Sequence, residues 1–387
     1  MKNVAIVGAG ASGCICAYFL LKSGFKVTLF DKNLPLRTLL PTGGGRCNLA
    51  HAEYDFKELA KNYPRGEKFL YSVFSKFSTA DTLEMFESMG IKTYTQENGR
   101  IFPESNSSKE VQETILKELR KLGVKFVQEE IKDCQKSDKF YLNLTSPSSG
   151  FQPPSPLKGE GFDIVVLATG GRSGYELLKP YGINIIEPKP SLVGLNTIEN
   201  FQDLSGTVIK GVNSEGFVDS ILFTHFGISG PLIYTISSLH AFDIMPYKLI
   251  IDTAPTLINL QELLDSNSKK DIKNILGEFL PHKFAKYILS GIDANLKGHQ
   301  IDGKLRDLIL DKIHHFEITI SGTNKGEETV TAGGVDLDEI NPKTMGVKKV
   351  PNLYCIGELL NIDGFCGGFN LQNAWSTAYV CAQSIIE

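Results

Sequence analysis

Residues 4–13, VAIVGAGASG, carry the strongest structural signal in this 387-residue chain. An apolar run, Val4–Gly8, leads directly into the pattern G-x-G-x-x-G at residues 8–13. A segment of helical length follows over residues 11–23 and stops at Gly24, and a second apolar run at 26–30 ends at Asp31. This order predicts a strand, a helix and a second strand that together form a βαβ unit.

Each glycine of the motif has a physical task in such a unit. Gly8 makes the tight turn, Gly10 lets the backbone approach a pyrophosphate, and Gly13 lets the helix pack against the strand. The helix N-terminus offers N–H groups and a partial positive charge to phosphates. Asp31, 23 residues after Gly8, is placed to accept hydrogen bonds from an adenosine ribose. The motif therefore predicts a bound dinucleotide, with a purely structural glycine turn as the alternative. NAD and FAD both use it.

Composition and charge exclude several classes of protein. With 42% hydrophobic and 22% charged residues, the chain is neither collagen-like, coiled-coil nor wholly disordered. Lys and Arg total 40 against 44 for Asp and Glu, so the net charge of −4 gives no general attraction for nucleic acid or anionic lipid, and neither is expected as a partner. Seven cysteines without a C-x-x-C predict neither a disulfide framework nor a zinc site, which fits a reducing, cytoplasmic setting. The uncharged run at 4–21 holds three glycines, which disfavours a signal peptide or membrane span.

The rest of the chain suggests two domains. Residues 54–121 have a mostly helical pattern, with Ser78 and Asp81 as capping residues. Residues 124–127 and 140–144 are expected to be strands of a small hairpin system, and 163–168 a buried parallel-type strand. The Pro-, Ser- and Gly-rich stretch 145–161 is predicted to be a flexible loop, and we assign it no function. A strand at 353–357 precedes a last helix from about Gly368.

The middle of the chain has a different pattern. Short alternating segments at 191–252 and 314–331 predict a small β-sheet or barrel, and residues 253–313 are helical and polar. We therefore expect an α/β fold in which residues 1–190 and 332–387 form a Rossmann-like domain. Residues 191–331 would be an inserted domain with a β-barrel part and a helical part.

Two further strand ends favour FAD over NAD. Thr169 and Gly170 follow the strand at 163–168, and Gly357 and Glu358 follow the strand near the C-terminus, so a long cofactor would lie across the sheet. The Glu358 carboxylate is suited to ribityl hydroxyls. The segment GGFNLQ, residues 367–372, opens the last helix, whose N–H groups suit the electron-rich pyrimidine edge of a flavin. A structural glycine-rich cap is the alternative for this segment.

In these motifs the chain resembles the BaiN/RdsA family of FAD-dependent oxidoreductases. The resemblance rests on GAGASG at 8–13, TGGGRCN at 42–48, GRIFPES at 99–105, ATGG at 168–171, FTHFGISGP at 223–231, TAGGVDLDEINPKTM at 331–345 and GELLNIDGFCGGFNLQNAW at 357–375. It implies non-covalently bound FAD in the Rossmann-like domain. The expected cofactor-binding residues are Gly8, Gly10, Ala11, Ser12, Gly13, Asp31, Lys32, Gly45, Arg46, Cys47, Asn48, Thr169, Gly170, Gly357, Glu358, Gly368, Asn370, Leu371 and Gln372.

Three residues are candidates for chemistry beyond cofactor binding. His225 is the best general acid of the inserted domain, although most histidines in such turns only bond locally. Arg100 is suited to hold a substrate carboxylate or phosphate, with a structural pair to Glu104 as the alternative. Cys47 lacks a resolving cysteine four or five residues on, so packing is favoured over a redox role. No metal site is predicted.

We therefore expect an enzyme that passes a hydride between flavin N5 and a small organic substrate, with NAD(P)H as a transient reductant. The alternatives are a flavin oxidase acting on a small amine and a non-catalytic FAD-binding module. The substrate and the oligomeric state are not predicted.

Overall fold

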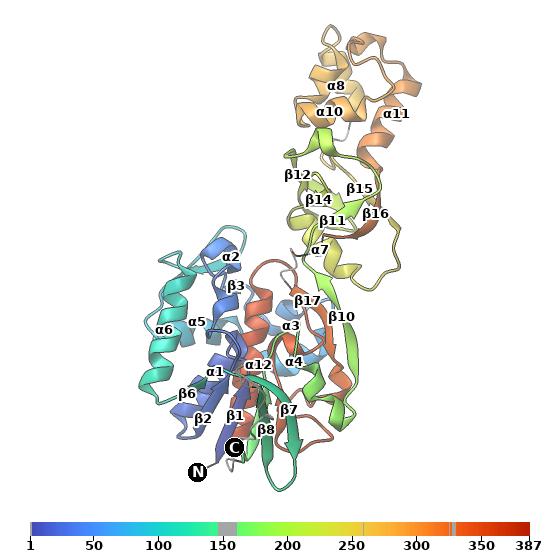
Figure 1. The fold of residues 1–387 in the computed structure, drawn as a ribbon. Helices are drawn as coiled ribbons and strands as arrows, with labels where there is room; N and C mark the ends of the chain where they lie inside the picture. The colour runs from blue at the N-terminus through green and yellow to red at the C-terminus, as the bar shows by residue number, and fades with distance from the viewer. Residues whose placement is uncertain (1, 146–160, 258, 325, 327–329) are drawn as a thin grey trace. The chain divides into compact units, whose positions relative to one another are not determined.

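The computed structural model describes residues 2–145, 161–257, 259–324, 326 and 330–387 (Figure 1). The chain forms two compact units, one of Met1–Lys189 with Val330–Glu387 and one of Pro190–Thr329. These divisions lie next to the boundaries expected from the sequence. Of the stretch 145–161, only the two end residues are described.

A five-stranded parallel sheet forms the centre of the first unit, in the order β18-β9-β1-β2-β6. Both ends of the chain contribute to it, because β18 from the C-terminal region joins β9 beside β1. The α/β prediction is thus confirmed. The central strand is almost wholly buried, as expected for a parallel sheet covered on both faces. The strands are β1 (Asn3–Val7), β2 (Lys26–Phe30), β6 (Lys125–Val127), β9 (Ile164–Leu167) and β18 (Leu353–Cys355).

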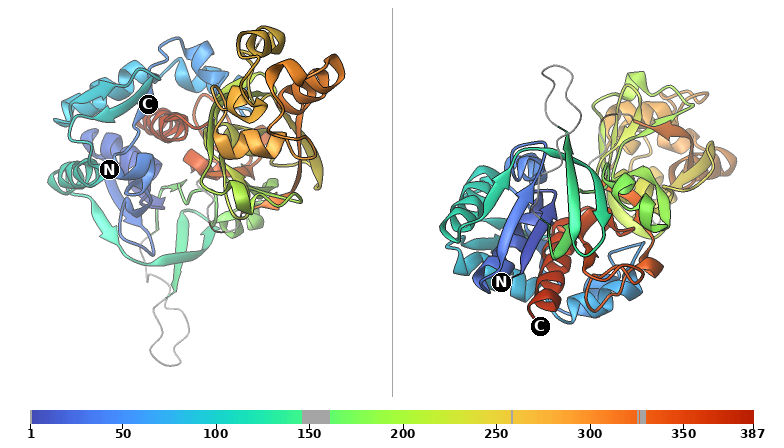
Figure 2. Two further views of the ribbon diagram at one scale, coloured as in Figure 1. Left: turned by 90° about the horizontal axis from the view of Figure 1, so that it is seen from above. Right: turned by 60° about the horizontal axis from the view of Figure 1, so that its bottom comes forward.

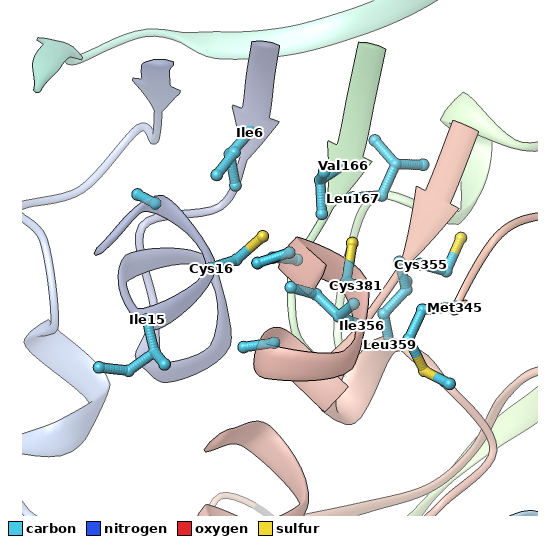
Figure 3. Close-up of a cluster of buried hydrophobic side chains, with 14 of the residues drawn as sticks. Ile6, Ile15, Cys16, Val166, Leu167, Met345, Cys355, Ile356, Leu359 and Cys381 are labelled. Atoms are coloured by element: carbon cyan, nitrogen blue, oxygen red, sulfur yellow. The ribbon is translucent and has the colours of Figure 1, made fainter. Parts of the chain in front are cut away.

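Helices α1 (Ala11–Lys22) and α12 (Phe369–Ile386) lie side by side against this sheet. Figure 3 shows Cys16 of α1 and Cys381 of α12 beneath β1, β9 and β18. The two thiols interact, and burial raises the pKa of Cys381 well above its ordinary value. Helix α6 (Ser108–Lys121) is amphipathic, since Val111, Ile115 and Leu119 fall on one buried stripe.

The connection from β2 to α6 contains strands that the sequence did not indicate. A small antiparallel sheet, β3-β5-β4, interrupts the region predicted as mostly helical. The predicted cap at Ser78 and Asp81 is present as a capping box at the start of α5. The elements are α2 (Thr42–Gly45), β3 (Ala50–His51), α3 (Phe56–Ala60), α4 (Glu67–Phe74), α5 (Thr79–Ser88), β4 (Thr93–Thr95) and β5 (Arg100–Pro103).

One predicted strand pairing is wrong. Residues 124–127 were expected in a hairpin system with 140–144, but β6 pairs in parallel with β2 instead. The hairpin consists of β7 (Glu130–Lys136) and β8 (Phe140–Thr145). The polar sequence of β7 hid this strand, because only Ile131 and Cys134 along it are buried. Strands β10 (Ile185–Ser191) and β17 (Val330–Val335) form a separate two-stranded sheet.

The second unit contains a closed barrel of antiparallel strands. The sheet order is β12-β13-β14-β11-β16-β15, and paired backbone hydrogen bonds between Asn213 and Asp252 join its two edges. Phe223, Phe284 and Phe316 pack together in the core of this unit. The strands are β11 (Leu195–Thr197), β12 (Val208–Ser214), β13 (Phe217–Phe223), β14 (Gly227–Ser229), β15 (Tyr247–Ile251) and β16 (Phe316–Thr323).

Short helices gather at one end of this barrel (Figures 1 and 2). They are α8 (Leu260–Ser266), α9 (Ile272–Leu276), α10 (His282–Ile288) and α11 (Gly303–His314), whereas α7 (Pro231–Leu239) follows β14. The helices occupy the part of the sequence that was predicted to be helical.

A charged cluster lies after α7 in the second unit. His240 contacts Glu215 through Nε2 at 2.8 Å and Asp243 through Nδ1 at 2.6 Å, and its ring stacks on Tyr247. Burial by itself lowers the pKa of His240, but hydrogen bonds to the two carboxylates raise it overall. The imidazolium form therefore links the turn between β12 and β13 to the segment that follows α7.

Candidate functional site

The glycine motif forms a tight turn at the carboxyl end of β1. Gly8 has φ of 106°, and a Cβ atom there would lie 2.2 Å from the carbonyl oxygen of Ala168. A Cβ at Gly13 would lie 1.9 Å from the carbonyl oxygen of Gly8. Gly10 differs, because a Cβ there would meet nothing within 4 Å. The outer two glycines therefore allow close backbone packing, and the middle one borders open space where a diphosphate would approach.

Asp31 ties this turn to the end of β2. Its Oδ2 accepts the Ala9 N–H at 2.8 Å, and its Oδ1 accepts the Asn33 N–H at 2.8 Å. Lys32 is exposed and pairs with Glu130 at 3.0 Å, an ion pair of small energetic value. Asp31 thus lies beside the glycine turn, whereas Lys32 faces solvent.

The ends of β9 and β18 lie at the same edge of the sheet. Thr169 follows β9 and donates its hydroxyl to the Ser173 carbonyl at 2.7 Å, and Gly170 has φ of 76°. Gly357 follows β18, and a Cβ there would lie 2.5 Å from Ser12 Oγ. The expected cofactor residues after β1, β2, β9 and β18 therefore share one edge. The strand order reverses between β1 and β9, where ligands bind in such sheets.

Glu358 is turned toward β17. Its Oε1 accepts the Thr331 N–H at 2.8 Å, and it lies 3.1 Å from where a Cβ of Gly171 would be. Burial raises the pKa of the Glu358 carboxyl. The Thr331 N–H thus holds one carboxylate oxygen of Glu358 in place.

The segment 42–48 has a backbone dominated by positive φ values, at Gly43, Gly44, Gly45 and Cys47. Arg46 folds back so that its Nε donates to the Gly43 carbonyl at 3.2 Å, and its guanidinium lies 4.2 Å from the ring centre of Phe102. Both contacts hold the side chain locally.

The next two residues of this segment differ in reactivity and bonding. Burial raises the pKa of Cys47 to about 12, so the thiol stays protonated at neutral pH, which disfavours a redox role. Asn48 has a buried Oδ1 that no donor in the described part of the chain reaches. A buried acceptor of this kind fits a ligand N–H group.

Helix α12 begins beside the segment 42–50. Gly368 has φ of 100°, and a Cβ there would lie 2.4 Å from the Ala50 carbonyl oxygen. The Asn370 side chain bonds both backbone groups of Gly364, at 2.9 and 2.7 Å. Gln372 is fully buried and donates to Thr82 and Ser376. Asn370 thus holds the protein loop before the helix, and the Gln372 amide nitrogen donates into the interior. The buried Oε1 of Gln372 has no donor among the described residues.

No sequence motif marks the residues that anchor α12 and the loop before it. Arg65 forms a two-pronged ion pair with the buried Asp363, and the Tyr63 hydroxyl donates to the Phe369 carbonyl at 2.6 Å. Trp375 Nε1 donates to the Leu49 carbonyl at 2.9 Å. The partners are about three hundred residues apart, so no local pattern marks them.

Arg100 and His225, two of the three candidates for further chemistry, lie in different units. Arg100 is on β5 of the first unit, and its Nη2 lies 3.7 Å from Cys366 Sγ. No ion pair joins Arg100 to Glu104 within the residues that the structure describes. His225 is exposed in the turn between β13 and β14 of the second unit, with its ring edge against Phe226.

The described ranges contain neither a metal-binding cluster nor a membrane-spanning helix. No group of three or more His, Cys, Asp or Glu side chains in them is arranged to hold a metal ion. No helix in them combines the length and the apolar character needed to cross a bilayer.

Similarity to known proteins extends over nearly the whole chain. The chain is 32% identical to a ribosomal RNA dihydrouridine synthase of Haemophilus influenzae, with 98% of this chain and 97% of that protein covered. It is 29% identical to the protein of the same name in Escherichia coli (99% and 98% covered). It is 27% identical to a 3-dehydro-bile acid delta(4,6)-reductase of Clostridium scindens, with both chains fully covered.

A solved structure with a similar fold and a matching family model support the same relationship. A solved flavocytochrome c3 fumarate reductase in an open conformation matches all of this chain and 78% of its own, with a TM-score of 0.51 at 14% identity, a likeness of fold. The family described as HI0933-like protein Rossmann domain matches residues 2–384. The chain therefore belongs to the HI0933-like Rossmann-domain family, the BaiN/RdsA group of FAD-dependent oxidoreductases that its motifs resemble.

Proposed function

We propose that this protein is an FAD-dependent reductase of a carbon–carbon double bond conjugated with a carbonyl group, with NAD(P)H as the reductant. The observation that carries the proposal is full-length similarity to relatives of two names, a dihydrouridine synthase and a delta(4,6)-reductase of a 3-dehydro-bile acid. A uracil ring and a 3-oxo steroid ring share this chemical group. When bound, FAD supplies the hydride that such a reduction requires.

The residues at the carboxyl edge of the sheet fit FAD. The open space at Gly10 and the N-terminus of α1 would receive the diphosphate, and Asp31 the adenosine ribose. Glu358 would bind the ribityl chain, and Asn48 offers its buried acceptor to a flavin ring N–H. The backbone at the start of α12 would face the pyrimidine edge. In this proposal, these backbone groups and side chains bind and orient the cofactor.

The substrate ring would come either as a small molecule or as part of an RNA. The net charge of −4 favours a small molecule, whereas two relatives are named for ribosomal RNA. We propose the small-molecule ring as the substrate and make the RNA an arm of the test.

The test is anaerobic mixing of the purified FAD-loaded protein with NADH or NADPH, followed by the loss of flavin colour. The reduced protein is then mixed with a 3-oxo-4,6-diene steroid or with an unmodified ribosomal RNA transcript. We expect colour to return with the steroid, and mass spectrometry to show a product that has gained two hydrogens. Return of colour with the RNA transcript alone would overturn the choice of a small-molecule substrate. Return of colour with air alone within seconds would favour the amine oxidase alternative. Failure of both nicotinamides to reduce the flavin would favour a non-catalytic module.

A further inference from the structure

Three side chains meet just before helix α12 in the first unit. Cys366 lies in the loop that precedes Gly367, and Arg100 Nη2 lies 3.7 Å from its Sγ. The register of β3 and β5 pairs His51 directly with Arg100. Directly paired residues of an antiparallel sheet project to the same face. We call Cys366, Arg100 and His51 the Cys366 cluster.

His51 holds the loop that carries the cysteine. Its Nδ1 lies 3.1 Å from the carbonyl oxygen of Gly367, and its ring stacks on Phe369 with centres 4.6 Å apart. A carbonyl oxygen only accepts, so Nδ1 carries the proton. Burial lowers the pKa of His51, so the ring is neutral at pH 7. His51 therefore positions the loop and adds no charge to the cluster.

Cys366 differs from the other cysteines. The other six are buried, and burial raises the pKa of Cys14, Cys47 and Cys355 above its ordinary value. Cys366 alone of the seven is partly exposed, and it lies beside a guanidinium. A neighbouring positive charge favours the thiolate that remains when a thiol gives up its proton. The cluster thus has the composition of a proton donor with a stabilised conjugate base.

The cluster also lies at a suitable distance from the glycine turn. The Gly357 N–H donates to Thr377 Oγ1 at 3.0 Å, and a Cβ at Gly357 would lie 2.5 Å from Ser12 Oγ, so Thr377 lies on α12 at the level of the glycine turn. From Thr377 back to Phe369 is eight residues, about 12 Å at 1.5 Å per residue. Cys366 precedes Phe369, so α12 separates it from the phosphate region by enough length for a ribityl chain.

We propose that the Cys366 thiol protonates the substrate in the reduction proposed above, and this inference rests on that proposed function. The hydride adds to the carbon β to the carbonyl, and the electron pair of the double bond moves toward the carbonyl oxygen. The S–H proton of Cys366 then goes to the α carbon, and the electron pair forms the new C–H bond. The thiolate stays paired with Arg100 until water returns a proton. NAD(P)H supplies the electrons, so the substrate gains one hydride and one proton.

The first experiment measures the thiol without any substrate. The FAD-loaded protein is treated with iodoacetamide, and peptide mass spectrometry follows alkylation of each cysteine. Cys366 should react at least about tenfold faster than the six buried cysteines. Arg100→Gln should slow its alkylation about tenfold, whereas Arg120→Gln, which removes an exposed arginine of α6, should not. Equal rates in the wild type and Arg100→Gln would overturn the proposed pairing.

The second experiment separates this role from the proposed function. Cys366→Ala should be reduced by NAD(P)H as fast as the wild type, but its reoxidation by the steroid or RNA probe should be slower by about a hundredfold or more. Equal flavin content and melting temperature in the two proteins would show that the variant is folded. Wild-type reoxidation rates in Cys366→Ala would refute the role of Cys366 alone. A wild-type protein inert toward both probes would refute the reduction and this role with it.

Discussion

Replacing Gly10 by alanine separates cofactor binding from folding. At Gly10 the backbone has φ of −80° and ψ of −166°, a conformation that alanine adopts freely, and the added Cβ meets nothing within 4 Å. Because alanine has fewer unfolded conformations than glycine, the free energy of unfolding of the cofactor-free protein should rise by about 0.4–1 kcal/mol. The same methyl group would occupy the space proposed for the diphosphate.

The effect on FAD binding should be large and opposite in sign. Loss of one charge-assisted hydrogen bond to the diphosphate costs about 1.5–3 kcal/mol, so the FAD Kd should rise about ten- to a hundredfold. Gly13→Ala is the matched control, since its Cβ would lie 1.9 Å from the Gly8 carbonyl oxygen. That overpacking should destabilise the cofactor-free protein by about 1–3 kcal/mol.

Two measurements decide between these outcomes. Urea unfolding of the cofactor-free proteins, followed by circular dichroism, gives the free energy of unfolding, and quenching of flavin fluorescence gives the FAD Kd. If Gly10→Ala bound FAD as tightly as the wild type, the open space at Gly10 would not be the diphosphate site. If its cofactor-free form were destabilised, the described turn geometry would be wrong.

Three further substitutions test other parts of the structure. Asp363→Asn should lower the free energy of unfolding by about 3 kcal/mol, because it breaks a largely buried ion pair with the Arg65 guanidinium. Urea unfolding measures this change, and an unchanged midpoint would show that the pair does not stabilise the fold. Gln372→Leu should reduce the melting temperature, because it removes the hydrogen bond from Gln372 to Thr82. The FAD Kd should stay within about twofold of the wild-type value, because the Gln372 side chain is buried in the protein interior; an increase in Kd above about tenfold would contradict this expectation. Against the opposing effect of burial, hydrogen bonds to two carboxylates raise the pKa of His240, so its charge pairs stabilise the fold fully below about pH 6.5 and lose this effect as the pH rises through the folded-state pKa. Thermal unfolding should therefore show the wild type losing its advantage over His240→Gln as the pH is raised above about 6.5. A pH-independent difference would exclude this contribution.

Local patterns were sufficient for the elements that build the sheet and the barrel. The βαβ unit at 3–30 follows from glycine spacing and apolar runs, and the short alternating segments of the second unit are its barrel strands. The pairing of 124–127 was not predictable in this way. Its four residues suit either a hairpin or a parallel edge, and only the presence of β2 beside it decides.

Side-chain roles at the start of α12 were harder to predict than the helix itself. The glycines of residues 367–368 predicted the helix start, but Gln372 is directed into the interior by its phase on α12 and by α5 packed against it. The Cys366 cluster depends on a β3–β5 sheet that the helical pattern of residues 54–121 concealed. A cysteine directly before Gly-Gly at a helix start is the one signal in the sequence that would have singled it out.

The interruption of the first unit by the second has a consequence for synthesis on the ribosome. Residues 190–329 are continuous, so the barrel can close as soon as they have emerged. The nascent first unit must meanwhile wait with β9 exposed at one edge, because β18 and α12 are translated only afterwards. During that interval the open edge of β9 can mispair with other strands, and early loading of the coenzyme, which would stabilise the partly formed unit, would shorten the vulnerable period.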